Sequence, residues 1–355
     1  MRIAVLGVGL IGGSVGLAAR RHVDGAEVVG HGRDPHRLER ARELGAVDSV
    51  AGSVEEALDG AAACFACGPV GVLAEQVEGA LAAAPRDCVV TDVGSTKRRL
   101  VEAVADPRFI GGHPIAGAET SGVEHARADL FSGAVWYLTP AESSSGLLYE
   151  RLHRLVAAFG ARPVAVDPET HDRRVAVFSH LPHVLANVLV TQAAERLTEH
   201  GDALSNVGPS LRDASRVAGA NTVMWSDVYR SNSEAIVDEV RRFAASLEEV
   251  AAMLEADSGI AKWNDAARAD RRRLLEPDPG GAPVHELRLT VPNRPGIVAR
   301  VALALSRAGV NIVDMALAPA ADMRSGAMTL WIAGDEQAAR AQSLIAELGF
   351  PVAEL

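Results

Sequence analysis

Lysine is almost absent from this sequence. Lys97 and Lys262 are the only two, and arginine supplies the rest of the 35 basic residues, against 46 acidic ones and a formal net charge of -11. Surfaces that bind nucleic acids or anionic membranes need clustered Lys and Arg to neutralise phosphate. We therefore expect no nucleic-acid partner and no membrane partner. Because arginine is the general cation here, a single arginine is weak evidence for a binding site.

Cysteine is equally scarce, with Cys64, Cys67 and Cys88 as the only three. Three cysteines form no even disulfide framework, and a chain of this size needs none, which favours a cytoplasmic location. Cys64 and Cys67 spell C-x-x-C, but they fall in a predicted buried strand, where residues three apart point to opposite faces. No second pair of cysteines or histidines lies nearby, so we predict no metal site.

The chain is long and apolar enough for two or three domains, with 355 residues of which 48% are hydrophobic. Across residues 1–167, short β-branched runs alternate with alanine-rich helical patterns, which is typical of an α/β fold with a Rossmann-type parallel sheet. We predict a doubly wound dinucleotide-binding domain there. Its seven strands are expected at residues 2–6, 27–30, 62–66, 88–91, 109–111, 134–138 and 162–165.

Residues 168–275 change to long helical patterns and predict an all-helical substrate and dimerisation domain. The stretch 184–190 carries apolar residues almost all round, which a helix tolerates only when it is buried. Interdigitation with a second subunit explains this pattern, so we predict a homodimer. Burial inside one chain remains the alternative.

Residues 276–283, rich in proline and glycine, read as a linker to a third unit at residues 284–355. Its patterns alternate as strand, helix, strand, strand, helix, strand. This βαββαβ order predicts a small ferredoxin-like domain. The elements are expected at residues 284–291, 295–308, 311–318, 328–333, 336–348 and 350–354.

A glycine-rich turn directly follows the first predicted strand. Gly7, Gly9 and Gly12 form G-x-G-x-x-G, and Leu10 and Ile11 begin the following helical pattern. The first glycine permits the tight turn, the second lets the backbone approach a pyrophosphate, and the third lets the helix pack closely on the strand. The context of strand, turn and helix predicts an NAD or NADP site that includes all five residues.

The end of the second predicted strand decides between the two nicotinamide cofactors. Gly32 takes the position where an acidic residue would hold the ribose 2′-hydroxyl, and Arg33 follows it. Loss of that carboxylate and the presence of an arginine favour NADP, whose 2′-phosphate pairs with Arg. Asp34 is the counter-argument, because a shift of two residues would make it the ribose acceptor and restore NAD.

Ligands of open α/β sheets bind at the carboxyl ends of the strands, and two polar sets follow strands here. The first is Asp-Val-Gly-Ser-Thr-Lys at 92–97, and the second is Gly-His-Pro-Ile-Ala-Gly at 112–117. His113 is held between glycines and a proline, and its near-neutral pKa suits a proton acceptor. Ser95 is placed to hydrogen-bond His113 or the cofactor, or to cap a helix that begins at Thr96.

Three histidines lie within thirteen residues of the helical region: His171, His180 and His183. The i,i+3 spacing of His180 and His183 suggests a metal site. We discount it because no cysteine or Glu-x-x-His pattern accompanies the pair and a proline between the two disturbs the helix.

Farther along, Arg212 and Arg216 lie four residues apart, which places them on one face of a helix and suits a carboxylate ligand. A solvated helix face with an internal ion pair is the equal alternative. Trp225, nine residues later, is more often a core residue than a site residue.

These motifs together resemble the prephenate and arogenate dehydrogenases of tyrosine biosynthesis. The resemblance covers nearly the whole chain and rests on the glycine turn, the 92–97 string, His-Pro-Ile-Ala-Gly at 113–117 and Ser-His-Leu-Pro-His at 179–183. The C-terminal unit resembles an ACT domain, a module that binds amino acids. The resemblance implies oxidative decarboxylation of prephenate, arogenate or both with hydride transfer to NAD(P), and tyrosine as an effector.

By the same resemblance, His113 is the catalytic base for the ring hydroxyl, and Ser95 orients His113 and the nicotinamide. Arg216 pairs with the ring carboxylate. The other implied substrate-binding residues are Arg212, His183, Trp225, Glu119 and Asp213, of which Glu119 and Asp213 form an ionic gate with Arg216.

Two other functions remain open from the residues. A related β-hydroxyacid dehydrogenase would need a catalytic lysine in the helical domain, where Lys262 lies far beyond the candidate site. An amino-acid-sensing regulator would not need Ser95, His113 and Arg216 together.

Overall fold

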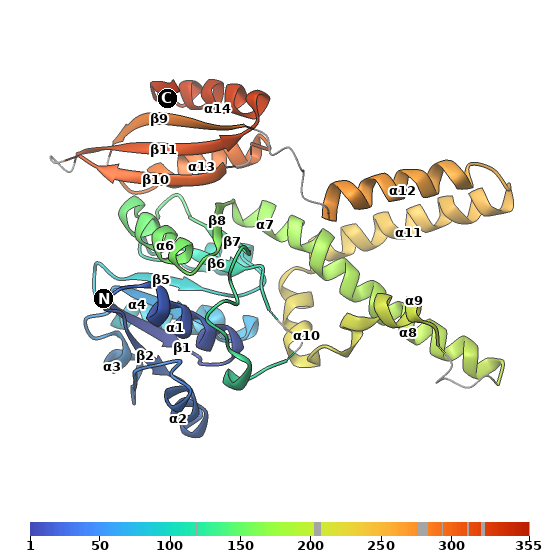
Figure 1. Cartoon of the computed structure of the whole chain (residues 1–355), viewed down its shortest axis with the longest axis horizontal. Helices are drawn as coiled ribbons and strands as arrows, with labels where there is room; N and C mark the ends of the chain where they lie inside the picture. The colour runs from blue at the N-terminus through green and yellow to red at the C-terminus, as the bar shows by residue number, and fades with distance from the viewer. Residues whose placement is uncertain are drawn as a thin grey trace.

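The computed structural model describes residues 1–117, 120–201, 207–275, 283–292, 294–310, 312–320 and 324–354. Figure 1 shows an N-terminal α/β part, a helical arm that extends away from it, and a C-terminal sheet with its helices above the α/β part. The predicted architecture of a Rossmann-type domain, a helical domain and a ferredoxin-like domain is confirmed.

The first sheet is fully parallel, with the strand order β3-β2-β1-β4-β5. Alternate residues of β1 face two separate hydrophobic cores, one on each side of the sheet: Ile3 and Val5 belong to the first, and Ala4 and Leu6 to the second. Both faces are therefore covered, as the near-continuous apolar strands predict. The strands are β1 (Arg2–Leu6), β2 (Glu27–His31), β3 (Ser49–Val50), β4 (Ala63–Ala66) and β5 (Val89–Asp92).

A second, three-stranded sheet has the order β6-β7-β8, with β6 and β7 antiparallel. It comprises β6 (Gly111–Pro114), β7 (Val135–Thr139) and β8 (Arg162–Ala165). The prediction of one seven-stranded sheet is therefore wrong, and β3 was not predicted. Parallel neighbours need a crossover helix, whereas the described chain between β6 and β7 holds only the 3-10 turn η2 (Val123–His125) and returns antiparallel. A single parallel bridge between Val90 and Phe109 connects the two sheets.

Helices cover the sheets on both sides. The glycine turn leads into α1, whose N-cap is Gly9. The helices of the α/β part are α1 (Leu10–His22), α2 (Pro35–Glu43), α3 (Val54–Leu58), the 3-10 turn η1 (Val70–Val72), α4 (Leu73–Ala83), α5 (Arg98–Ala103) and α6 (Gly146–Ala158).

The helical part begins with one long rod. It consists of α7 (Pro168–Val175), the π-helical segment η3 (Ala176–His180) and α8 (Leu181–Glu199). By length and composition alone this rod is apolar enough to cross a membrane, a test that core helices also pass. The other helices are α9 (Pro209–Ala214), the 3-10 turn η4 (Arg216–Gly219), α10 (Thr222–Ser231), α11 (Ser233–Glu255) and α12 (Ile260–Leu275).

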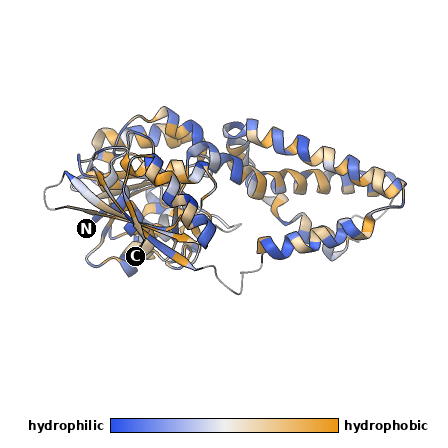
Figure 2. Cartoon of the chain, turned by 90° about the horizontal axis from the view of Figure 1, so that it is seen from above, coloured by the Kyte–Doolittle hydropathy of each residue, from blue (hydrophilic) through white to orange (hydrophobic). Residues whose placement is uncertain are grey.

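Figure 2 shows apolar residues along the helices of the helical arm, and many of them are exposed. Val188 is 56% exposed and Phe178 47% exposed. The alternative that the apolar stretch 184–190 is buried inside one chain is therefore wrong, because Val188, Leu189 and Val190 all rank among the exposed apolar residues.

The C-terminal unit is an antiparallel sheet with the order β10-β11-β9-β12, and its βαββαβ order is confirmed. It docks on the α/β part, where the N–H of Gly296 donates to Ser144 O (2.7 Å) and His153 Nε2 lies 3.2 Å from Asp314 Oδ1. Its elements are β9 (Val284–Pro292), α13 (Ile297–Arg307), β10 (Ile312–Pro319), β11 (Ser325–Ala333), α14 (Asp335–Glu347) and β12 (Val352–Glu354).

Candidate active site

The glycine turn has the geometry of a dinucleotide cradle. Gly7 adopts φ +98° and its N–H donates to His31 O at 2.8 Å. A Cβ on Gly12 would lie 2.1 Å from Gly7 O, whereas a Cβ on Gly9 would meet nothing within 4 Å. The helix N-terminus at Leu10 has no side-chain cap and no acidic residue in its first turn. Its N–H groups therefore remain available to a pyrophosphate, and Gly9 leaves that approach open.

The three residues at the end of β2 have different surroundings. Gly32 has space for a side chain, because an added Cβ would lie 3.6 Å from Leu38, an ordinary contact. Arg33 is exposed. Asp34 caps α2: its Oδ1 accepts the N–H groups of His36 (3.0 Å) and Arg37 (3.3 Å). The carboxylate of Asp34 is thus engaged by its own helix.

One buried carboxylate fixes the carboxyl end of β5 to the start of β6. Asp92 accepts the backbone N–H groups of Gly94 (2.7 Å) and Gly112 (3.1 Å). Lys97, which is also fully buried, forms an ion pair with the same carboxylate. Loss of either charge would leave the other buried and unpaired. The pair therefore holds the loop after β5 against β6.

His113 projects from β6 towards α7. Its Nδ1 lies 2.9 Å from Nε2 of His171, and Nδ1 of His171 lies 2.8 Å from Oδ1 of Asp172. The Asp172 carboxylate also accepts the backbone N–H groups of Lys97 (2.8 Å) and Arg98 (3.0 Å) at the start of α5. His171 and Asp172 are 0% and 3% exposed. A continuous chain of hydrogen bonds thus runs from His113 to the start of α5.

Burial controls the protonation of this chain. It lowers the pKa of His113 well below its ordinary value; the charge of Lys97 adds to the effect, as do His171 and His180 when they are protonated. Burial lowers the pKa of His171 in the same way, with Lys97 as the next cause. Burial raises the pKa of Asp172, which its two backbone N–H donors oppose. At neutral pH both imidazoles of the pair are therefore uncharged.

The π-helical segment η3 lies between the two halves of the histidine-bearing rod. A π turn adds a residue to one turn and rotates everything beyond it, and such turns are frequent at functional sites. His180 ends this segment and is 1% exposed, and burial lowers its pKa to about 4. Its Nδ1 lies 3.2 Å from Nδ2 of Asn232, which also donates to Asp172 O at 2.8 Å.

His183 and Trp225 are in contact. Their rings stack at a centroid distance of 3.5 Å and an interplanar angle of 4°. Nδ1 of His183 hydrogen-bonds the Tyr229 hydroxyl and lies 3.3 Å from Nδ2 of Asn187. Within the described ranges, Nε2 of both His180 and His183 is buried without a hydrogen-bond partner. Both nitrogens can therefore serve a ligand.

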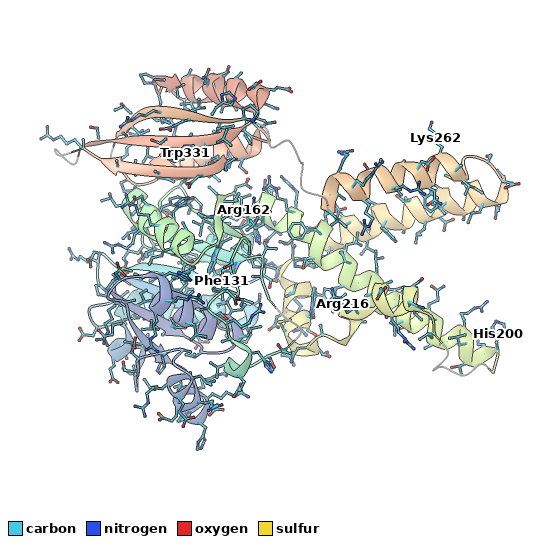
Figure 3. All side chains as sticks on the ribbon, viewed as in Figure 1. Phe131, Arg162, His200, Arg216, Lys262 and Trp331 are labelled. Carbon is cyan, nitrogen blue, oxygen red and sulfur yellow. The ribbon has the colours of Figure 1, made fainter. Side chains whose placement is uncertain are left out.

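The two arginines do not share one helical face. Arg212 lies in α9, which ends at Ala214, and Arg216 opens the separate turn η4, which packs against α8 (Figure 3). The predicted single face is wrong because the chain changes from α to 3-10 geometry at Ser215. Asp213 is exposed on α9. Glu119 lies outside the described residues.

Ser95 lies in the loop between β5 and α5 and is half-buried. The expected helix cap is wrong, because α5 begins at Arg98 with Lys97 as its N-cap and no side-chain cap bond. Among the residues that the structure describes, the partner of His113 Nδ1 is His171, and no hydrogen bond joins His113 to Ser95.

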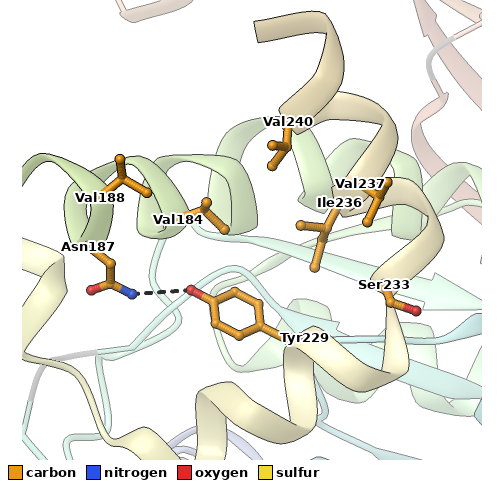
Figure 4. A pocket seen from close by; sticks show the side chains of 8 residues that line it. All are labelled: Val184, Asn187, Val188, Tyr229, Ser233, Ile236, Val237 and Val240. Carbon is orange, nitrogen blue, oxygen red and sulfur yellow. Dashed lines mark hydrogen bonds between the residues drawn. The ribbon is translucent and has the colours of Figure 1, made fainter. Parts of the chain in front are cut away.

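A pocket of about 440 Å³ lies between α8, α10 and α11. Figure 4 shows Tyr229 and Asn187 at one side of it, joined by a hydrogen bond of 3.4 Å. Tyr229 connects this pocket to His183, but neither His113 nor His171 lines it. The lining is mostly aliphatic: Val184, Asn187, Val188, Tyr229, Ser233, Ile236, Val237 and Val240.

The remaining ligand-type residues do not gather. In the described part of the chain no group of three or more His, Cys, Asp or Glu side chains could hold a metal. Cys64 and Cys88 are buried and Cys67 is half-buried, and burial raises the pKa of each thiol. Lys262 lies on α12, in the outer arm of the helical part (Figure 3).

Sequence reasoning missed the partners that orient the site. It noted His171 only as one of three histidines and assigned Asp172 no role. Tyr229 and Asn187, which hold His183, were not singled out. Their signal was weak, because each acts through contacts with segments more than 40 residues away or through its position on a helix face.

Three family models match successive parts of the chain. The nucleotide-binding domain of prephenate dehydrogenase matches residues 15–165, and the dimerization domain of prephenate dehydrogenase matches residues 167–264. An ACT domain like that of the AHAS small subunit matches residues 287–349. These matches agree with the motifs and with the order of the three structural units.

Full-length relatives give the same result. The chain is 28% identical over 360 aligned positions to a prephenate dehydrogenase of Bacillus subtilis, covering 97% of this chain and 95% of the relative. It is 31% identical over 310 positions to a prephenate dehydrogenase of Lactococcus lactis, covering 84% and 85%.

Solved structures agree as well. A prephenate dehydrogenase of Aquifex aeolicus, in complex with hydroxyphenyl propionate and NAD+, superposes with a TM-score of 0.73 at 28% identity, covering 77% of this chain and 98% of that one. An arogenate dehydrogenase of Synechocystis gives 0.67 at 26% identity, covering 78% and 100%. The chain is a nicotinamide-dependent dehydrogenase and belongs to the prephenate dehydrogenase family.

Proposed function

We propose that this protein catalyses the oxidative decarboxylation of prephenate, arogenate or both in tyrosine biosynthesis, with NAD(P) as hydride acceptor. The observation that carries the proposal is the position of His113, half-buried on β6 and hydrogen-bonded to His171, in the same α/β part as the dinucleotide turn. The names of the relatives and the complex of the Aquifex aeolicus enzyme support this choice.

His113 is the catalytic base of the proposed reaction. The bound nicotinamide supplies the acceptor for the hydride from the ring carbon that bears the hydroxyl. His113 accepts the hydroxyl proton as that oxygen becomes a carbonyl, and returns it when loss of carbon dioxide makes the ring aromatic and leaves a phenolate. A neutral imidazole suits both transfers. Ser95, in the adjacent loop, is assigned to orient His113 and the nicotinamide by the family resemblance alone.

The substrate carboxylates are assigned to the helical part. Arg216 pairs with the ring carboxylate, and Arg212 adds positive charge. His183, held flat on Trp225, directs its unpartnered Nε2 to the substrate; because its Nδ1 faces the amide NH2 of Asn187, which only donates, Nδ1 accepts and Nε2 carries the hydrogen and donates. Glu119 and Asp213 are assigned to the gate with Arg216 by the family resemblance alone.

The cofactor residues are assigned to Gly7, Gly9, Leu10, Ile11 and Gly12 at the pyrophosphate. At the adenosine ribose, NADP is favoured over NAD. Gly32 offers no carboxylate to the 2′-position and Arg33 is exposed beside it. The counter-argument from Asp34 loses weight, because two backbone N–H groups and the guanidinium of Arg37 engage that carboxylate.

We assign the dinucleotide site to residues 1–167, substrate binding and dimerisation to residues 168–275, and regulation to residues 284–355. A second copy of the chain would cover the exposed apolar face of α8 and the adjoining pocket. Tyrosine is the expected effector of the ACT unit, as the product of the pathway. Three free cysteines fit a cytoplasmic enzyme.

The test is a matrix of initial rates, with prephenate and arogenate each assayed with NAD and NADP, and with and without tyrosine. Nicotinamide reduction is followed by absorbance. We expect turnover of at least one ring substrate, higher kcat/KM with NADP, and a change on addition of tyrosine. Absence of reduction in every combination would refute the proposed function.

The role of His113 is tested by His113→Asn in the same assay. Loss of the base should lower kcat about 100-fold or more, while the affinity for cofactor stays near that of the unchanged protein. His125→Asn, on the turn η2, serves as the control. A His113→Asn protein with full kcat would show that the base has been assigned wrongly.

A further inference from the structure

We propose that His171 and Asp172 are positioning residues that act through His113, by fixing which of its two nitrogens is basic. The proposal rests on the function proposed above and extends it from one histidine to a chain of three groups. Neither residue need touch substrate. Its basis is the pair of hydrogen bonds that join His113, His171 and Asp172.

The first step is the state of Asp172. Three hydrogen bonds reach its carboxylate: Lys97 N to Oδ1 (2.8 Å), Arg98 N to Oδ2 (3.0 Å) and His171 Nδ1 to Oδ1 (2.8 Å). All of the backbone partners are donors, and an ionised carboxylate offers acceptors only. The ionised form therefore satisfies the arrangement, and Nδ1 of His171 must carry a hydrogen to donate to it.

The second step follows from the chemistry of neutral imidazole, which carries one N–H and one lone pair. With its hydrogen on Nδ1, His171 has its lone pair on Nε2. That lone pair accepts the hydrogen bond from Nδ1 of His113 at 2.9 Å. The hydrogen of neutral His113 is thus on Nδ1, and its Nε2 is left as the basic nitrogen.

The third step is the consequence for proton transfer. When the substrate O–H bond breaks and an N–H bond forms on Nε2, His113 becomes an imidazolium. Its Nδ1–H is then a charged donor to His171, and charge-assisted hydrogen bonds are stronger than neutral ones. The three hydrogen-bonded groups His113, His171 and Asp172, here called the relay, therefore make His113 a stronger base than a lone buried histidine would be. No second proton has to leave these groups.

The surroundings leave His171 uncharged while His113 titrates. Burial lowers the pKa of His171 well below its ordinary value, so replacing it removes no positive charge at neutral pH. The rings of His113 and His171 meet edge to face at a centroid distance of 5.1 Å. The charged or titratable groups that face the relay are described on five elements: Lys97 in the loop after β5, Arg98 on α5, His180 on η3, Asp167 and Arg174 of α7 and its cap, and Tyr137 on β7.

The test compares His171→Leu with His171→Gln in the full-length enzyme. Leucine has no acceptor for His113 Nδ1–H, whereas the side-chain oxygen of glutamine can accept it. We expect His171→Leu to lower kcat about 100-fold, with KM for the ring substrate and cofactor affinity changed less than about threefold. His171→Gln should recover a large part of that loss. His153→Gln, a buried histidine on α6 outside the relay, is the matched control.

The pH profile of kcat separates positioning from packing. The base form of His113 is active, so activity falls as the pH drops through its pKa. Loss of the acceptor destabilises the imidazolium and lowers that pKa further, so the acidic limb of His171→Leu should move to lower pH while its plateau falls. Two results would indicate a purely structural role for His171 and overturn the proposal. One is a lower kcat with no shift of the acidic limb of the pH profile, and the other is a lower melting temperature as the sole change.

A measurement that needs no catalysis tests the relay separately from the proposed function. In protein labelled with ¹⁵N-histidine, the ring nitrogens of the unchanged enzyme should show His113 protonated on Nδ1 with Nε2 as the lone-pair nitrogen. Asp172→Asn should alter the tautomer of His171. If these spectra show the opposite tautomer for His113, the relay is wrong even for an active enzyme. If they show the expected tautomers but neither ring substrate is turned over, only the proposed function fails.

Discussion

Gly32 is the residue at which a single substitution should change cofactor choice. An added side chain has room, because a Cβ would lie 3.6 Å from Leu38. Gly32→Asp would supply a carboxylate to the ribose 2′-hydroxyl and would repel a 2′-phosphate. We expect the ratio of kcat/KM for NADP to that for NAD to fall about 100-fold, a change of roughly 3 kcal/mol.

The matched control is Gly32→Asn, which has the same size without the charge and should lower the ratio much less. Steady-state rates with both cofactors give the answer. A Gly32→Asp enzyme that keeps the original ratio would show that the adenosine ribose does not lie at the end of β2.

Some residue roles were predictable because their signal is local. The glycine turn is predictable from the spacing of its glycines and from the strand before it. His113 is predictable from its place after a strand. The role of Asp172 was not, because its carboxylate captures backbone N–H groups about 75 positions away in the chain. The buried ion pair of Lys97 with Asp92 was not predictable either. Lys97 stands out in a chain with only two lysines, but the sequence does not indicate its partner.

At the scale of elements, the first turn of α1 offers a matched pair of substitutions. A Cβ on Gly12 would lie 2.1 Å from Gly7 O, so Gly12→Ala must displace backbone. We expect it to lower the free energy of unfolding by about 2 kcal/mol or more. A Cβ on Gly9 meets nothing within 4 Å, so Gly9→Ala should cost less than about 1 kcal/mol.

Gly9→Ala, which should cost less stability than Gly12→Ala, should nevertheless weaken nucleotide binding. Gly9→Ala fills the approach to the pyrophosphate and should weaken nucleotide binding at least about tenfold in a folded protein. Urea unfolding and titration with NADPH fluorescence measure the two effects. Equal nucleotide affinity in Gly9→Ala and the unchanged protein would contradict the assigned cradle.

The order of strands and helices was predictable where the hydrophobic periodicity is strong. The local helix geometry and the direction of strand pairing were not. The βαβ rhythm and the βαββαβ unit follow from patterns of two and 3.6 residues. The π-helical segment Ala176–His180 has no such period, yet it sets how His180 and His183 lie relative to His171. The change to 3-10 geometry at Arg216 and the antiparallel pairing of β6 likewise depend on packing rather than on local sequence.

At the scale of the whole molecule, many arginines of this chain of net charge -11 are paired locally. Their partners are acidic residues three or four positions away on the same helix, and such exposed pairs contribute little stability. The helix-paired arginines include Arg37, Arg40, Arg42, Arg154, Arg173, Arg196, Arg230, Arg242, Arg268 and Arg273.

The exposed apolar face of α8 should be the surface that a second copy covers. Val188 is 56% exposed and lines the pocket beside Tyr229. In a twofold dimer a substitution acts twice, so Val188→Glu should bury two unpaired charges and raise the dimer dissociation constant at least about 100-fold. Leu44→Glu, at an exposed site that follows α2, is the control and should leave association unchanged. Sedimentation velocity over a range of concentrations measures both. If Val188→Glu associates as tightly as the unchanged protein, the interface lies elsewhere on the helical arm.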